Sequence, residues 1–147
     1  MHAEDMAEEF PVVSIDSSAL EAARMMAEHR LPGIVVTDTS GAPYAVLPAS
    51  QVVRFIVPTY VQDDPSLAGV INESWADHAA EKLGDRAVRE MLPQHLTDLP
   101  AAKADDTIIE VAALMARFRS PLIAVMKDGK LHGVVTASRL LAAALQR

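Results

Sequence analysis

The chain has 147 residues, and its 13 Lys and Arg against 20 Asp and Glu give a net charge of −7. This length fits one compact domain or two small halves that share a core. The acidic balance argues against a nucleic-acid partner, which requires a basic face to neutralise phosphates. Because the sequence has no cysteine, disulfides, thiolate zinc sites and thiol catalysis are excluded.

The hydrophobic residues indicate a folded, soluble protein. They make up 50% of the sequence and charged residues 22%, which suits a chain that buries a core. The longest apolar runs, such as residues 33–36, are far too short to span a bilayer. The first five residues are acidic and lack the basic head and apolar stretch of a secretion signal. We therefore expect a cytoplasmic protein without membrane insertion.

The first predicted elements are a helix, two strands and a second helix. Ser18 and Glu21 have capping-box spacing, in which the hydroxyl accepts from a backbone N–H and the carboxylate bonds back to the cap. Apolar residues then recur at helical spacing until Pro32 ends the helix. Residues 34–36 and 44–47 are predicted strands around a turn, and residues 50–57 a second helix that stops at Pro58.

Residues 58–84 are predicted to form a helical insertion. A helix start is expected at residues 63–66, with Pro65 in its first turn. A further helix is predicted for residues 72–83, ending at Gly84. Residues 86–88 are predicted to form a short strand and residues 93–99 a loop.

The opening pattern returns in the second half of the chain. Thr107 and Glu110 repeat the capping box, strands at residues 122–125 and 132–135 flank an Asp-Gly turn, and a helix follows at residues 138–146. Residues 14–36 align with residues 103–125, and the alignment continues beyond the turn with an offset one residue shorter. The identical pairs include Asp16/Asp105, Glu21/Glu110, Met26/Met115, Arg30/Arg119, Pro32/Pro121, Ile34/Ile123, Val46/Val134 and Ser50/Ser138. Since the strands are apolar on both faces, helices should cover them.

This repeat resembles a tandem pair of CBS domains, the Bateman-type regulatory module named after cystathionine β-synthase. The resemblance lies in residues 87–91, in the two helix openings and in residues 133–138. It implies an α/β (α+β) fold in which two βαββα repeats are related by a pseudo-twofold axis. We accordingly divide the chain into repeat 1 (residues 1–57), the helical insertion (58–84) and repeat 2 (85–147). The resemblance also implies a flat homodimeric disc.

The resemblance further implies two clefts between the repeats, which in many family members bind adenosine-containing ligands such as AMP, ADP, ATP or S-adenosylmethionine. The family signature is a threonine near the phosphate, followed three residues later by an aspartate that holds the ribose hydroxyls. Repeat 2 keeps Thr136 but has Arg139 in the aspartate position, and repeat 1 has Pro48 and Gln51. Neither repeat therefore carries the ribose carboxylate.

Each candidate residue of the clefts also has a structural interpretation. For Thr136, a helix cap is favoured over a phosphate contact, and the cap interpretation is stronger still for Ser50 and Ser138. Arg139 is either an anion ligand or a solvated or acid-paired side chain. Gln51 is either a polar ligand contact or, preferably, a surface residue. Asp16 and Asp105 are candidate cleft-wall residues, although assistance to the helix caps is favoured for both.

Two functions remain open on the sequence alone. The first is a sensor module that binds a small anionic or adenosyl ligand in a cleft. The alternative is a ligand-free dimerisation or docking module for a separately encoded enzyme or transporter. We expect no enzymatic activity, because no nucleophile, base and stabiliser occur together, and no metal site, because no histidine pair has ligand spacing.

Overall fold

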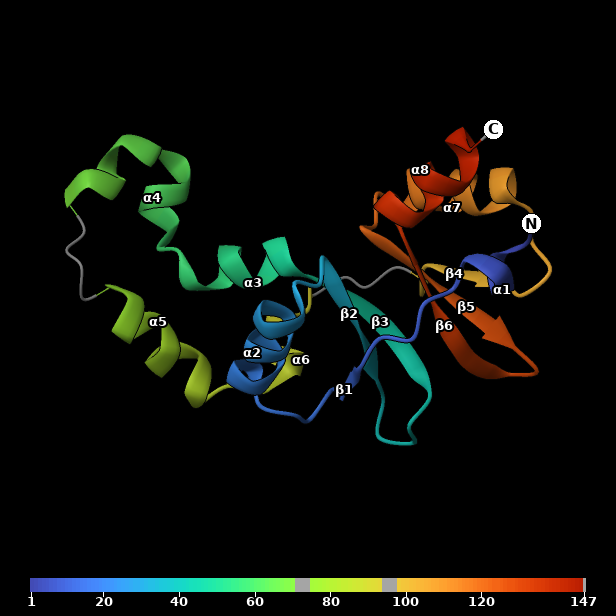
Figure 1. The fold of residues 1–147 in the computed structure, drawn as a ribbon. Helices are drawn as coiled ribbons and strands as arrows, with labels where there is room; N and C mark the ends of the chain where they lie inside the picture. The colour runs from blue at the N-terminus through green and yellow to red at the C-terminus, as the bar shows by residue number, and fades with distance from the viewer. Residues whose placement is uncertain (71–74, 94–97, 147) are drawn as a thin grey trace.

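The structure contains two three-stranded sheets built on one plan. The computed structural model describes residues 1–70, 75–93 and 98–146. In the first sheet, β1 (Val12–Ser14) runs parallel to β2 (Gly33–Thr37), which pairs antiparallel with β3 (Pro43–Pro48). The second sheet repeats this order with β4 (Ala101–Lys103), β5 (Leu122–Lys127) and β6 (Lys130–Thr136) (Figure 1). The mixed fold with two related repeats is therefore confirmed.

Two helices pack against each sheet and complete a βαββα unit. They are α2 (Ala19–His29) and α3 (Ala49–Ile56) in the first repeat, and α7 (Ile108–Phe118) and α8 (Ala137–Leu145) in the second. Met26 of α2 shares a buried cluster with Ile34 of β2, and Val111 of α7 shares one with Ile123 of β5. The helical spacing of the apolar residues thus predicted the buried faces correctly.

The ends of α2 and α7 follow from local chemistry. The Thr107 hydroxyl accepts from the Glu110 N–H at 3.3 Å, and the Glu110 carboxylate accepts from the Thr107 N–H at 3.1 Å, which is the expected capping box. At the start of α2, the Ser18 hydroxyl accepts from the Glu21 N–H at 3.4 Å. Both helices end on an arginine in the left-handed region, with φ of 53° at Arg30 and 50° at Arg119.

The strands bury one face against their own helices and the other against the opposite repeat. In β2, Ile34 and Val36 belong to the core of the first repeat, whereas Val35 points the other way. Val35 packs in a cluster with Leu122, Ala124 and Val134 of the second repeat. Because side chains alternate along a strand, this arrangement explains why the strands carry apolar residues on both faces. The two repeats face each other across this shared layer.

The insertion extends away from the second repeat (Figure 1). It consists of α4 (Thr59–Asp63), the 3₁₀ helix η1 (Pro65–Val70) and α5 (Trp75–Gly84). The sequence did not predict α4. The helix start expected at residues 63–66 corresponds to η1, and the predicted helix at residues 72–83 corresponds to α5, although its first three residues lie outside the described part. Most of the predicted loop at residues 93–99 also lies outside it.

The predicted strand at residues 86–88 is wrong. Only Ala87 forms an isolated bridge, with Ser18, and the short helix α6 (Val88–Met91) follows. Val88 and Met91 are both buried in the core of the first repeat. The Glu90 carboxylate accepts from the Ala87 N–H at 2.8 Å and so caps the helix, a stabilisation that a strand would lose.

Each repeat completes its core with a segment from elsewhere in the chain. The helix α1 (Ala3–Met6) buries Ala3 and Met6 in the second repeat (Figure 1), just as α6 buries its apolar side chains in the first. The backbone bonds match: the Ala3 N–H donates to Asp106 O and the Val88 N–H to Ser17 O, both at 2.8 Å. The two segments are thus equivalent under the internal symmetry.

Candidate functional site

A cleft lies between the repeats beside Gln51, the residue that replaces the family aspartate. Its volume is about 170 Å³. The first repeat supplies the end of β3 and the first turn of α3, and the second supplies the turn that follows α7. The cleft is lined by Ala45, Val46, Pro48, Gln51, Pro93, Asp98, Pro100, Phe118, Arg119 and Ser120. Both repeats therefore contribute residues to this cleft.

Gln51 and Arg119 are the polar groups of this cleft that best suit a ligand. The Gln51 Nε2 donates to the Met91 carbonyl of α6 at 3.2 Å, which fixes the amide. Its Oε1 has no hydrogen-bond partner in the part of the chain that the structure describes. Arg119 is exposed at the left-handed end of α7. Among the described residues, no carboxylate lies within ion-pair distance of its guanidinium.

The hydroxyl of Thr136 is already used in the structure. Thr136 is only 6% exposed and is the N-cap of α8. Its Oγ1 accepts from the Arg139 N–H at 3.2 Å and lies 3.2 Å from the Ser138 hydroxyl. These bonds match the favoured interpretation of Thr136 as a helix cap.

Ser50 and Ser138 do not cap their helices, contrary to expectation. The N-cap residues are Pro48 and Thr136, so both serines lie in the first helical turn, where they are exposed. The predicted helix starts were one to two residues late, because each helix begins directly after the last strand residue.

The N-terminal segment covers the region around Arg139. The Arg139 Nη2 lies 3.5 Å from the Asp5 carbonyl oxygen. Next to it, Glu8 and Val134 exchange backbone hydrogen bonds of 2.8 and 2.9 Å along the edge of β6. The equivalent of Glu8 in the first repeat is Pro93, which has no N–H to donate to β3. The two pseudo-equivalent positions therefore differ: the N-terminal segment pairs with β6 through its backbone, whereas Pro93 lines the cleft beside β3 and has no N–H to pair with it.

The two aspartates lie apart from both clefts. Asp16 forms an ion pair with Arg89 of α6. Asp105 is exposed and lines a separate hollow with Glu4 and Lys127. There the Lys127 ammonium lies 2.9 Å from the Glu4 carboxylate, which raises the pKa of Lys127. The seven candidate residues therefore do not form a single site in this structure.

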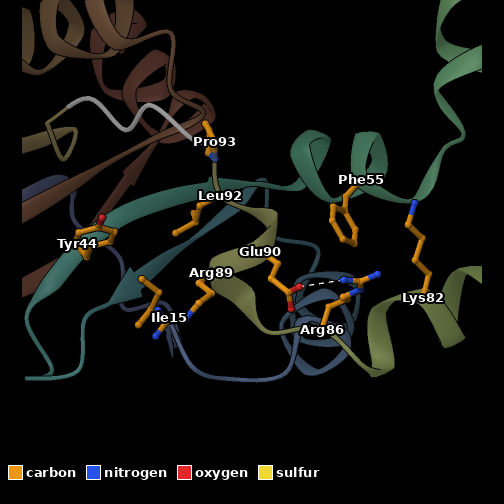
Figure 2. A pocket seen from close by; sticks show the side chains of 9 residues that line it. All are labelled: Ile15, Tyr44, Phe55, Lys82, Arg86, Arg89, Glu90, Leu92 and Pro93. Carbon is orange, nitrogen blue, oxygen red and sulfur yellow. Dashed lines mark hydrogen bonds and ion pairs between the residues drawn. The ribbon is translucent and has the colours of Figure 1, made fainter.

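A larger groove, of about 650 Å³, lies where the insertion meets the first repeat (Figure 2). Its apolar walls are Ile15, Tyr44, Phe55, Leu92 and Pro93, and its charged residues are Lys82, Arg86, Arg89 and Glu90. Sequence analysis missed this groove. The signal in the sequence was the cluster of Lys82, Arg86 and Arg89, three basic residues within eight positions of an acidic chain.

The charges of this groove are partly satisfied within the protein. Arg86 Nη1 lies 3.1 Å from Glu90 Oε1, and the Lys82 Nζ lies 5.1 Å from the centre of the Phe55 ring. The pKa of Glu90 is lowered, first by the Ala87 N–H and then by Arg86. The Arg86–Glu90 pair is about half exposed, so it contributes little stability and can be exchanged for other partners.

Neither a membrane-spanning helix nor a group of metal ligands occurs in the part of the chain that the structure describes. None of its helices is long and apolar enough to cross a bilayer. In the same part of the chain, no three His, Asp or Glu side chains are grouped so that they could hold a metal ion.

Two related βαββα units that share a crevice define a tandem regulatory module. The family model "CBS domain" matches residues 3–58 and 88–146. The chain therefore belongs to the CBS domain family, which confirms the resemblance. Among curated proteins, none matches the chain.

Solved structures agree with this assignment. A CBS domain-containing protein of unknown function from Kribbella flavida is 57% identical, with 99% of each chain covered and a TM-score of 0.84. The CBS domain of a membrane protein from Sphaerobacter thermophilus is 22% identical, with 100% of this chain and 90% of that chain covered and a TM-score of 0.72. CBSX2, solved in complex with AMP, is 17% identical over 99% of this chain and 96% of that chain, with a TM-score of 0.66. The last two share the fold.

Proposed function

We propose that this CBS domain pair is a non-catalytic sensor that binds a small anionic ligand in the cleft beside Gln51 and Arg119. The observation that carries the proposal is the difference between the two pseudo-equivalent positions. Glu8 pairs with β6 through its backbone, whereas Pro93 stands in the equivalent place beside β3 and lines a cleft of about 170 Å³. An adenosine nucleotide is the first ligand class to test, because CBSX2 has this fold and was solved with AMP.

The residues of the cleft beside Gln51 suit a nucleotide, although they differ from the family signature. A guanidinium binds phosphate oxygens through paired N–H groups, and Arg119 is exposed for that contact. The Gln51 Oε1 can accept from one ribose hydroxyl, whereas the family carboxylate can accept from two. We therefore expect weaker binding than in members of the family that keep the aspartate.

The size of the cleft points to a conformational response. Ligand sites commonly have volumes of about 300–1,000 Å³, and this cleft has about 170 Å³. A nucleotide would bind better to a form in which the repeats lie further apart at this edge. Its binding would shift the population toward that form, which is how such a module would signal to a partner protein.

The test is a thermal melt of the protein with AMP, ADP, ATP and S-adenosylmethionine at millimolar concentration. At least one should raise the melting temperature in a saturable way. Arg119→Ala should abolish the shift from phosphate-bearing ligands, and Gln51→Ala should weaken it. Arg139→Ala, at the pseudo-equivalent position of Gln51 beside β6, is the matched control and should leave it unchanged. No shift with any of the four would overturn the proposal.

A homodimer is supported by a separate observation. Ile109 of α7 and Leu141 and Leu145 of α8 are 74%, 56% and 74% exposed. Leu141 and Leu145 lie four residues apart and therefore share one helix face. We infer that this face joins two copies of the chain, and that the dimer presents the module to a separately encoded effector. The ligand-free docking function would keep the dimer but show no ligand-dependent melt.

A further inference from the structure

We propose that the groove between the insertion and the first repeat is a second ligand site, and that it takes a small anion carrying an aromatic ring. This site is separate from the cleft beside Gln51, although Pro93 borders both. Its volume of about 650 Å³ falls within the usual range for small-molecule sites. Figure 2 shows Lys82, Arg86 and Glu90 toward α5, and Arg89 beside Ile15 on the side of Tyr44.

The charges of the groove favour an anion. Lys82, Arg86 and Arg89 line it, and Glu90 is the only acid among the lining residues that the structure describes. The Arg86–Glu90 and Arg89–Asp16 pairs are about half exposed. Pairs so exposed to water are held weakly, so each arginine can turn part of its guanidinium toward a ligand oxygen. The whole chain carries a net charge of −7, so this groove is positive against its surroundings.

The apolar residues favour an aromatic ring next to the anion. Tyr44 of β3 is 42% exposed, although it borders Ile15 and Leu92 in the groove. Phe55 of α3 lies at the other end, beneath Lys82. Aromatic faces gain from offset stacking or edge contacts with another ring. A ligand with both parts would cover Tyr44 and place its anion by Arg89, which lies beside Ile15 on that side of the groove (Figure 2).

The insertion gives the groove a wall that the hollow beside Glu4 in the second repeat does not have. Lys82 comes from α5 and Arg86 from the turn after it, and α5 packs on α2 and α3. In the second repeat, Glu4 occupies the place of Arg89, as their equivalent bonds to Ala104 O and Ile15 O show. The helix α6 forms part of the groove through Arg89 and Glu90. The Met91 carbonyl of the same helix accepts a hydrogen bond from the side-chain amide of Gln51. A ligand in the groove is therefore placed to influence the cleft beside Gln51 through α6.

The probe is phenyl phosphate, titrated at millimolar concentration into the ¹⁵N-labelled full chain and followed by NMR. We expect saturable shifts of the amides of Tyr44, Arg89 and Leu92, and of the Gln51 side-chain amide. The double variant Arg86→Ala/Arg89→Ala should weaken binding by about tenfold or more, the usual loss for charged hydrogen bonds. Tyr44→Ala should weaken phenyl phosphate and leave inorganic phosphate unchanged.

Arg119→Ala is the control for the other cleft and should leave the groove shifts unchanged. Each variant's undisturbed spectrum away from the groove shows that it is folded. The proposal is overturned if the wild-type groove amides do not shift. It is also overturned if the double variant binds as tightly as the wild type, or if the shifts gather around Arg119 and vanish in Arg119→Ala. The last result would instead support the proposed nucleotide cleft.

Discussion

Glu8 and Val134 pair through two backbone hydrogen bonds, of 2.8 and 2.9 Å, and so fasten the N-terminal segment to the edge of β6. The contact depends on Gly133, because a Cβ at that position would lie 2.8 Å from the Glu8 carbonyl oxygen. The same segment carries Ala3 and Met6 into the core of the second repeat. The pairing of Glu8 with Val134 thus links the edge of β6 to the stability of the second repeat.

Gly133→Ala should loosen this N-terminal segment. The added methyl group meets backbone atoms that cannot move without shifting residues 7 and 8. We expect a loss of about 1–3 kcal/mol in the free energy of unfolding, typical of overpacking, and faster hydrogen exchange at the Glu8 amide. Gly69→Ala, where the methyl group meets open space, is the control for the substitution. Equal stability of the two variants would contradict this account of Gly133.

Thr136 should stabilise the protein through its N-cap hydrogen bond to α8. Comparing Thr136→Ser with Thr136→Ala isolates the hydroxyl, since both remove the methyl group. The alanine variant should be less stable than the serine variant by about 1 kcal/mol, the usual worth of an N-cap. Chemical denaturation measures the difference, and nucleotide affinity should be the same in both. A change in affinity with equal stabilities would show that Thr136 contacts ligand instead.

The capping carboxylate of Glu110 should make stability depend on pH. Bonds from the Thr107 N–H and hydroxyl lower the pKa of Glu110 below its ordinary value of 4.5. Its contribution to stability is therefore complete above that value and disappears as the pH falls through the lower, folded-state pKa. Glu110→Gln should flatten the stability curve in this acidic range. Glu9→Gln, an exposed acid outside any helix, should leave the curve unchanged, and an identical curve for Glu110→Gln would contradict the prediction.

The exposed leucines of α8 should hold the dimer together. Leu141→Glu/Leu145→Glu places two charges in the proposed interface, where burial without a partner is costly. Light scattering should give a monomer for this variant and a dimer for the wild type. Tyr60→Glu, at an exposed position on α4 of the insertion, is the control and should remain dimeric. A dimeric leucine variant would place the interface elsewhere.

Local chemistry explains what could be predicted from the sequence. The helices after Ser18 and Thr107 and the four longer strands follow from caps, apolar spacing and turns. The Asp-Gly turn is an example, with φ of 53° at Asp128 and 76° at Gly129. The repeat itself indicated two equivalent halves, and their facing arrangement came from the family resemblance.

The remaining features depend on contacts between distant parts of the chain. The three-residue strands β1 and β4 form only because β2 and β5 provide an edge to pair with. The helix α6 replaced the predicted strand because Val88 and Met91 bury in the first repeat and Glu90 caps the turn. The pairing of Glu8 with β6, and the groove around Arg86, involve residues whose neighbours no local pattern reveals.

The most direct test of the central claim is a crystal structure of the protein grown with AMP at millimolar concentration. The account predicts ligand density in the cleft between the repeats, with the phosphate at Arg119 and a ribose hydroxyl at Gln51, while Glu8 remains paired with Val134. Density at Thr136 and Arg139 with the N-terminal segment displaced, or an empty cleft beside Gln51, would contradict it.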